Sequence, residues 1–185
     1  MFAGLQQAII QLGLPQEDIV VVYDIGCNGN MADFVNTYGI HSLHGRSIPT
    51  ALGVKLANPK LKVIVIGGDG GIYGEGLNHL IAAARLDHDI SVFVANNQLY
   101  SLTTGQTSPT TPKGAKTKST PEGNPSIAFD PVGILHAVNP HALVETVDGS
   151  KPLDVISAMK KAIITPGFAL VDLHQVCVTF GKQLG

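Results

Sequence analysis

Charged residues are scarce in this sequence. Only 14% of its 185 residues are Asp, Glu, Lys or Arg, and the formal net charge is −2 at pH 7. Because no polybasic block occurs, nucleic acid and anionic membranes are not expected partners. No apolar run reaches the roughly 18–20 residues that a membrane-spanning helix needs. Residues 1–7 lack the basic residues that begin a signal peptide, so we expect a cytoplasmic protein.

Cysteine is also scarce. Only Cys27 and Cys177 occur, far apart in the sequence and without a CxxC pair. In a cytoplasmic chain this spacing does not indicate a structural disulfide. From composition alone we expect two buried thiols that pack as small hydrophobic side chains.

Apolar residues, by contrast, make up 44% of the chain, enough for a packed core. Residues 61–66 and 90–94 are continuous apolar runs, which are typical of parallel strands buried on both faces. Further strands are expected at 19–23, 142–147 and 168–173, and helices at 2–12, 46–56, 76–85, 131–137 and 154–164. This alternation predicts a single α/β domain over 1–185, with three layers and a mainly parallel sheet covered by helices on both faces.

Polar and glycine residues follow two neighbouring expected strands. The run Gly67–Gly71 follows the first strand, Asn96 and Asn97 follow the second, and 25 residues (71–95) lie between Gly70 and Asn96. Since ligands bind outside the carboxyl ends of parallel strands, we expect these two loops to be neighbours at one sheet edge.

The residue types there suit a diphosphate held through a divalent cation. Glycines let the backbone approach phosphate oxygens, and Asp69 and Asn97 offer the hard oxygen ligands that Mg²⁺ prefers. A helix expected to begin near Gly74 would point its N-terminus at the anion. Other phosphate-binding motifs are absent, since there is no P-loop signature and Tyr73 stands where a dinucleotide fingerprint needs glycine.

A Gly-Asp-Gly after one strand and an Asn-Asn after the next resemble the thiamine diphosphate motif. Three more segments, DIGCNG at 24–29, NTYGIHSLHGR at 36–46 and LYSLTTGQTSPTT at 99–111, resemble loops of the β-subunit of 2-oxoacid:ferredoxin oxidoreductases. The resemblance extends from about residue 2 to about residue 182 and implies the thiamine diphosphate-binding fold.

The resemblance also implies roles for individual residues. Asp69 and Asn97 would bind Mg²⁺ through their side chains and Leu99 through its carbonyl, while Gly68 and Gly70 would cradle the diphosphate. The remaining implied contacts are His44 near the phosphates, Ile25, Gly26 and Cys27 near the thiazolium ring, and Tyr100, Leu102 and Thr103 on a loop that closes over the cofactor.

In this family, thiamine diphosphate supports oxidative decarboxylation of a 2-oxoacid, coenzyme A takes the acyl group, and electrons pass through iron–sulfur clusters to ferredoxin. The resemblance therefore implies an α-subunit partner, which carries the activating glutamate. We assign no catalytic residue to this chain, and we interpret Glu75 as an acidic residue in the first turn of a helix. The sequence does not determine which 2-oxoacid is used, although the sequence of the loop at 99–111 favours an enzyme that acts on 2-oxoglutarate or on a broad range of 2-oxoacids.

The chain departs from the family pattern at several positions. Cys27 and Cys177 match two of the four cysteines that hold a 4Fe–4S cluster, but the N-terminal CxxC pair is missing, and two thiolates alone do not hold such a cluster. We expect that the native chain starts further upstream; alternatively, the cluster is absent or is completed by another subunit. Gly71 replaces a common acidic or amide residue, and Ser101 replaces a usual glycine.

Two other functions remain open. A subunit of a non-oxidative thiamine diphosphate-dependent 2-oxoacid decarboxylase would share Asp69 and Asn97 but need no cluster. A cluster-less, non-catalytic relic would not bind the diphosphate. The sequence contexts of the two cysteines and the threonine-rich loop favour the oxidoreductase.

Overall fold

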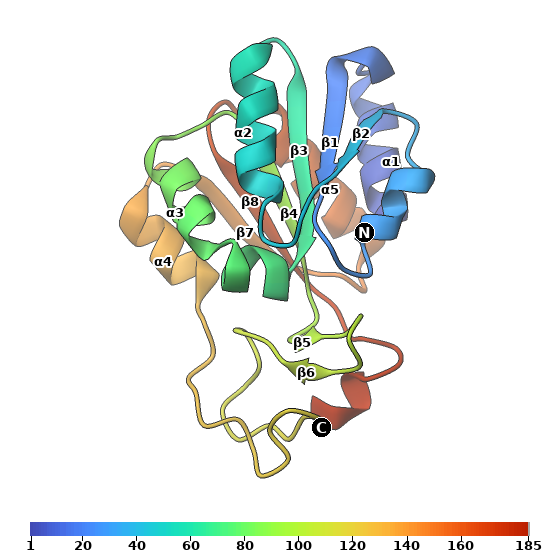
Figure 1. The fold of residues 1–185 in the computed structure, drawn as a ribbon. Coiled ribbons are helices and arrows are strands. Elements are labelled where there is room, and N and C mark those ends of the chain that lie inside the picture. Colours follow the sequence, from blue (N-terminus) through green and yellow to red (C-terminus); the bar gives the residue numbers. More distant parts are fainter. Residues whose placement is uncertain (185) are drawn as a thin grey trace.

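The computed structural model describes residues 1–184 and contains one six-stranded sheet (Figure 1). Its strand order is β2-β1-β3-β4-β8-β7, and every neighbouring pair is parallel. The strands are β1 (Ile19–Tyr23), β2 (Tyr38–His41), β3 (Lys62–Gly68), β4 (Ser91–Asn96), β7 (Leu143–Asp148) and β8 (Ala169–His174). The predicted α/β class with a parallel sheet is confirmed.

Helices cover both faces of this sheet (Figure 1). On one face lie α1 (Phe2–Leu12) and α5 (Pro152–Ile164), and on the other lie α2 (Ser47–Ala57), α3 (Leu77–Arg85) and α4 (Pro131–Val138). Alternate residues of a strand enter the two hydrophobic clusters: Ile64 of β3 packs with α1 and α5, whereas Val65 packs with α2 and α3. Burial on both faces explains why these strands are apolar throughout.

Local sequence signals set several element boundaries. Helix α1 buries the stripe of Leu5, Ala8 and Ile9 and ends at Gly13, whose φ of 63° lies in the left-handed region that suits glycine. Both α1 and β1 have the predicted bounds. Among the helices of residues 1–184, none combines the length and the apolar character needed to cross a membrane.

The structure corrects the predicted elements at three places. Edge strand β2 was not predicted, because its residues are mostly exposed and carry no apolar run. A π-helical segment, Gly70–Glu75, leads into α3, so helical structure begins directly after Asp69 and not near Gly74. The threonine-rich region contains a small antiparallel pair, β5 (Leu99–Tyr100) and β6 (Gln106–Thr107).

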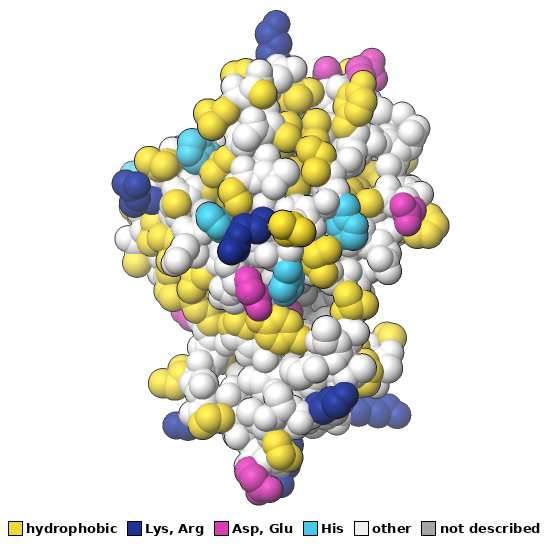
Figure 2. All heavy atoms as spheres, in the orientation of Figure 1, with side chains coloured by type: hydrophobic (Ala, Val, Ile, Leu, Met, Phe, Trp, Pro, Cys, Tyr) yellow, Lys and Arg dark blue, Asp and Glu magenta, His cyan; other side chains and the backbone are white. Residues whose placement is uncertain are grey.

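This threonine-rich region forms a lobe below the carboxyl edge of the sheet, next to the C-terminal segment (Figure 1). Hydroxyl groups hold the lobe together: Thr107 Oγ1 lies 2.7 Å from the hydroxyls of both Thr117 and Thr120. In the space-filling view, charged and histidine side chains gather near the junction of the lobe and the sheet (Figure 2). The threonine-rich lobe therefore lies against the edge of the sheet that carries the Gly-Asp-Gly and Asn-Asn motifs.

Candidate cofactor-binding site

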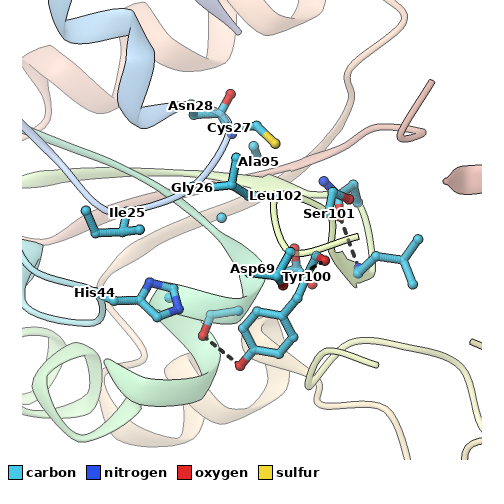
Figure 3. Close-up of a pocket in the computed structure, with 16 residues that line it drawn as sticks. Ile25, Gly26, Cys27, Asn28, His44, Asp69, Ala95, Tyr100, Ser101 and Leu102 are labelled. Carbon is cyan, nitrogen blue, oxygen red and sulfur yellow. Dashed lines mark hydrogen bonds between the residues drawn. The ribbon is translucent and has the colours of Figure 1, made fainter. Parts of the chain in front are cut away.

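A pocket lies at the carboxyl edge of the sheet, where β1, β3 and β4 end (Figure 3). All twelve residues predicted to contact the cofactor line it: Ile25, Gly26, Cys27, His44, Gly68, Asp69, Gly70, Asn97, Leu99, Tyr100, Leu102 and Thr103. The lining also includes Asn28, Gly71, Ala95 and Ser101. The structure therefore brings together residues from four segments, while their contact with a cofactor stays a prediction.

Asp69 is the buried carboxylate of this pocket. Asp69 follows β3 and is 1% exposed. Its Oδ2 accepts a hydrogen bond of 2.8 Å from the hydroxyl of Thr110. Burial raises the pKa of the Asp69 carboxyl above its usual range, although hydrogen bonds from Ser108, Thr110 and the backbone of Asn97 oppose the shift. Burying a charged carboxylate costs free energy, and a neighbouring cation offsets that cost. The position of Asp69 therefore suits a metal ligand.

Asn97 and Leu99 lie opposite Asp69 because β3 and β4 are paired, with Gly68 in register with Ala95. Asn97 Oδ1 accepts the Leu99 N–H at 3.0 Å, and between them Gln98 adopts a left-handed φ of 61°. Residues 1–184 contain no group of three or more His, Cys, Asp or Glu side chains placed to hold a metal. One carboxylate, one amide and one carbonyl oxygen still fit Mg²⁺, which takes its other ligands from phosphate and water.

Two glycines after Asp69 allow a close approach of neighbouring groups. A Cβ at Gly70 would lie 2.2 Å from the ring of Tyr100, and one at Gly71 would lie 2.4 Å from Asp24 Oδ1. The π-helical segment starts at Gly70, so its first residues, which include backbone N–H groups without a partner inside the helix, belong to the lining of the pocket. The backbone here suits an anionic group.

His44 is oriented by a buried carboxylate. Its Nδ1 lies 2.9 Å from Asp24 Oδ1, and Asp24 also accepts the Gly45 N–H at 3.1 Å and the Ser47 hydroxyl at 2.7 Å. Because a carboxylate only accepts, the imidazole donates from Nδ1. Its Nε2 then faces Glu75, whose Oε2 is 3.3 Å away.

Tyr100 lies beside His44 in the pocket lining, with the two ring centroids 6.2 Å apart. Its hydroxyl donates to Glu75 Oε1 at 3.2 Å. The same hydroxyl lies 3.5 Å from the carbonyl of Gly70 (Figure 3). Burial and the neighbouring Glu75 carboxylate raise the pKa of Tyr100 well above its usual value. Glu75, which we interpreted as a first-turn residue, lies in the last part of the π-helical segment and links His44 to Tyr100.

Comparison with known proteins bears on what this pocket holds. The model of the family described as "Thiamine pyrophosphate enzyme, C-terminal TPP binding domain" matches residues 24–173. The chain belongs to this family. The match includes every residue of the predicted magnesium site and excludes Cys177.

Within this thiamine pyrophosphate enzyme family, the chain is similar to β-subunits of 2-oxoacid:ferredoxin oxidoreductases. It is 41% identical over 184 residues to subunit beta of enzyme 1 from Aeropyrum pernix, covering 97% of this chain and 56% of that protein. It is 37% identical over 170 residues to the 2-oxoglutarate synthase subunit KorB of Archaeoglobus fulgidus, covering 92% and 63%. The chain thus spans less than two thirds of the length of these relatives.

Solved structures agree on the fold of this family member. The 2-oxoglutarate:ferredoxin oxidoreductase from Magnetococcus marinus, with 2-oxoglutarate, coenzyme A and succinyl-CoA bound, superposes with a TM-score of 0.92 at 32% identity. The match covers 97% of this chain and 61% of that chain. A thiamine diphosphate-dependent 4-hydroxybenzoylformate decarboxylase from Rhodococcus jostii has a TM-score of 0.60 at 20% identity, covering 94% and 32%, and shares the fold. The resemblance seen in the sequence is confirmed.

The two thiols do not match the expectation of buried side chains. Cys27 is exposed and Cys177 is partly exposed, because both lie on segments that follow strand ends. Burial, together with the charge of Cys177, raises the pKa of Cys27, so the two thiols are close enough to influence each other. Burial also raises the pKa of Cys177. The nearby Ser101 hydroxyl and the backbone N–H groups of residues 179–181, of which that of Phe180 donates to Sγ at 3.3 Å, outweigh burial, and the pKa is lowered overall.

The hydroxyl of Ser101 is buried and, among the described residues, has no hydrogen-bond partner. The sequence did not indicate that this hydroxyl would lie near Cys177, where it helps to lower the pKa of the thiol. Asp24 and Thr110 were also not assigned roles. Asp24 lies 20 residues from His44 in sequence, and Thr110 lies 41 from Asp69, so no local spacing connects either pair.

Proposed function

We propose that this chain is the thiamine diphosphate-binding part of the β-subunit of a 2-oxoacid:ferredoxin oxidoreductase. In the assembled enzyme, a 2-oxoacid is oxidatively decarboxylated to an acyl-CoA and the electrons pass to ferredoxin. The observation that carries the proposal is the gathering of all twelve predicted contact residues in one pocket. The similarity to β-subunits with these names supports the reaction class.

Asp69, Asn97 and the carbonyl of Leu99 would hold Mg²⁺, and the backbone from Gly68 to Gly70 would approach the diphosphate oxygens. Bound thiamine diphosphate supplies the nucleophilic carbon that adds to the keto group of the 2-oxoacid. His44 lines the pocket, with its Nδ1 held by Asp24 and its Nε2 3.3 Å from Glu75 Oε2.

Exposed apolar side chains near the site support a partner chain. Ile25 and Leu102 of the pocket are 37% and 54% exposed, and Val176 and Val178, which flank Cys177, are 79% and 95% exposed. Exposed apolar groups close to a polar site are typical of a protein interface. We propose that the α-subunit covers them and brings the activating glutamate.

The structure of the thiol pair limits what this chain contributes to electron transfer. Cys27 and Cys177 offer two thiolates, whereas a 4Fe–4S cluster takes four cysteine ligands. We propose that both thiols belong to such a cluster and that its other two ligands lie outside residues 1–185. A brown chromophore in the assembled complex would support this assignment over a non-oxidative decarboxylase.

Calorimetric titration with thiamine diphosphate and Mg²⁺ tests the proposal, first on the chain and then on its complex with the α-subunit. We expect binding that requires Mg²⁺, and Asp69→Ala should raise the Kd at least about 100-fold, because even residues that only support a metal ligand contribute 10–100-fold. Asp18→Ala is the control, since Asp18 is exposed and precedes β1 at the other sheet edge. Binding only in the complex would mean that the α-subunit completes the site. Absence of binding in both settings would refute the proposal and favour the relic.

A further inference from the structure

A buried polar network extends from Asp69 away from the residues already assigned. Thr110 Oγ1 lies 2.8 Å from Asp69 Oδ2 and also 2.8 Å from Asn96 Oδ1. Asn96 Nδ2 donates to Asp172 Oδ2 at 3.1 Å. Asp69, Thr110, Asn96 and Asp172 are each at most 4% exposed. Thr110, Asn96 and Asp172 do not belong to the lining of the cofactor pocket.

The direction of the hydrogen bonds in this network is fixed at its far end. Asp172 accepts from the hydroxyl of Tyr73 at 3.0 Å and lies 2.9 Å from Nε2 of His174, so it faces donors at both oxygens. Asn96 therefore turns its amide nitrogen to Asp172 and its amide oxygen to Thr110. The network leaves the Thr110 hydroxyl 2.8 Å from two oxygens that can only accept, Asn96 Oδ1 and Asp69 Oδ2. The Ser108 hydroxyl, which can donate or accept, lies further away at 3.3 Å.

Thr110 has one hydroxyl proton for these two acceptors. The carboxylate is the stronger acceptor, so the hydroxyl donates to Asp69 when no cation competes. A cation bound to Asp69 would make its carboxylate a weaker hydrogen-bond acceptor. The Thr110 hydroxyl could then donate to the amide oxygen of Asn96, which lies at the same distance of 2.8 Å. The hydroxyl is thus never left unsatisfied in a buried position, which would otherwise cost free energy.

We infer that Thr110 is a positioning residue for Asp69, and this inference rests on the proposed metal-binding role of Asp69. Its hydroxyl engages Oδ2 and so sets which edge of the carboxylate faces the pocket. Because Thr110 belongs to the threonine-rich lobe, it also couples the placement of the lobe to the metal ligand. Groups that orient a metal ligand in this way contribute substantially to metal affinity.

The test compares the Kd for Mg²⁺ at saturating thiamine diphosphate, measured by calorimetry on the complex with the α-subunit. Thr110→Val removes the hydroxyl and keeps the shape, and it should raise the Kd about 10–100-fold. Thr110→Ser keeps the hydroxyl and should recover most of the affinity. Thr117→Val is the matched control, because Thr117 is 6% exposed in the same lobe but its hydroxyl contacts only Thr107, Ser119 and Thr120.

An unchanged Kd in Thr110→Val would overturn the inference, as would an equal loss in Thr117→Val or a failure of Thr110→Ser to recover affinity. If the valine variant does not assemble, Thr110→Ala removes the hydroxyl without a replacement methyl and takes its place in the comparison. Failure of the wild-type complex to bind Mg²⁺ and thiamine diphosphate at all would instead refute the proposed function.

Discussion

Gly71→Ala should destabilise this protein far more than a single methyl group suggests. The new Cβ would lie 2.4 Å from Asp24 Oδ1, 3.0 Å from its Cγ and 3.2 Å from Cε1 of His44. Asp24 has little freedom to move, because it is 1% exposed and bonded to His44, Gly45 and Ser47. Any larger side chain at position 71 would meet the same obstacle.

The cost follows from two contributions. Forcing extra atoms into a packed site costs about 1–3 kcal/mol. Displacing Asp24 breaks at least one hydrogen bond to a charged group, which costs about 1.5–3 kcal/mol. Their sum is about 3 kcal/mol or more, which for a chain of this size lowers the Tm by roughly 6–12 °C.

Thermal and urea unfolding of the chain measure this cost, with Gly68→Ala as the control. The added Cβ at Gly68 would have its nearest neighbour, the carbonyl oxygen of Ala95, at 3.9 Å, an ordinary contact. We expect that control to change stability by about 1 kcal/mol or less. If Gly71→Ala is no less stable than Gly68→Ala, the argument that Asp24 is held rigidly against residue 71 is wrong.

Two more predictions concern other parts of the molecule. Cys177 should be alkylated faster than Cys27 at pH 7–8, as followed by mass spectrometry of the cluster-free chain, because its lowered pKa increases the thiolate fraction whereas the pKa of Cys27 is raised. Ser101→Gly removes the nearby hydroxyl that helps to lower the pKa of Cys177 and should reduce this preference; an unchanged ratio would contradict the assignment. Gly53→Ala should stabilise the chain by about 1 kcal/mol in urea unfolding, since Gly53 lies inside α2 and the added Cβ meets nothing within 4 Å; a loss of stability would show that this face of α2 is not free.

The sequence by itself predicts those features of the structure that depend on residues close together along the chain. Apolar runs identify the central strands, and Gly13 marks the end of α1. Asp69 and Asn97 come directly after two successive strands, and this position alone predicts that they lie at one edge of a parallel sheet. These features could be predicted because each depends on residues close together along the chain, or on a rule that holds for every parallel sheet.

Only the tertiary structure decides which side chains support these residues. Asp24 meets His44 because β1 and β2 are neighbours, and Asn96 meets Asp172 across 76 residues because β4 and β8 are neighbours. The same holds for the two thiols, since the exposure of Cys27 and the partial exposure of Cys177 depend on where their segments lie relative to the sheet. Hydrophobic periodicity specifies that strands form and which faces they bury, but the order β2-β1-β3-β4-β8-β7 depends on packing between distant segments.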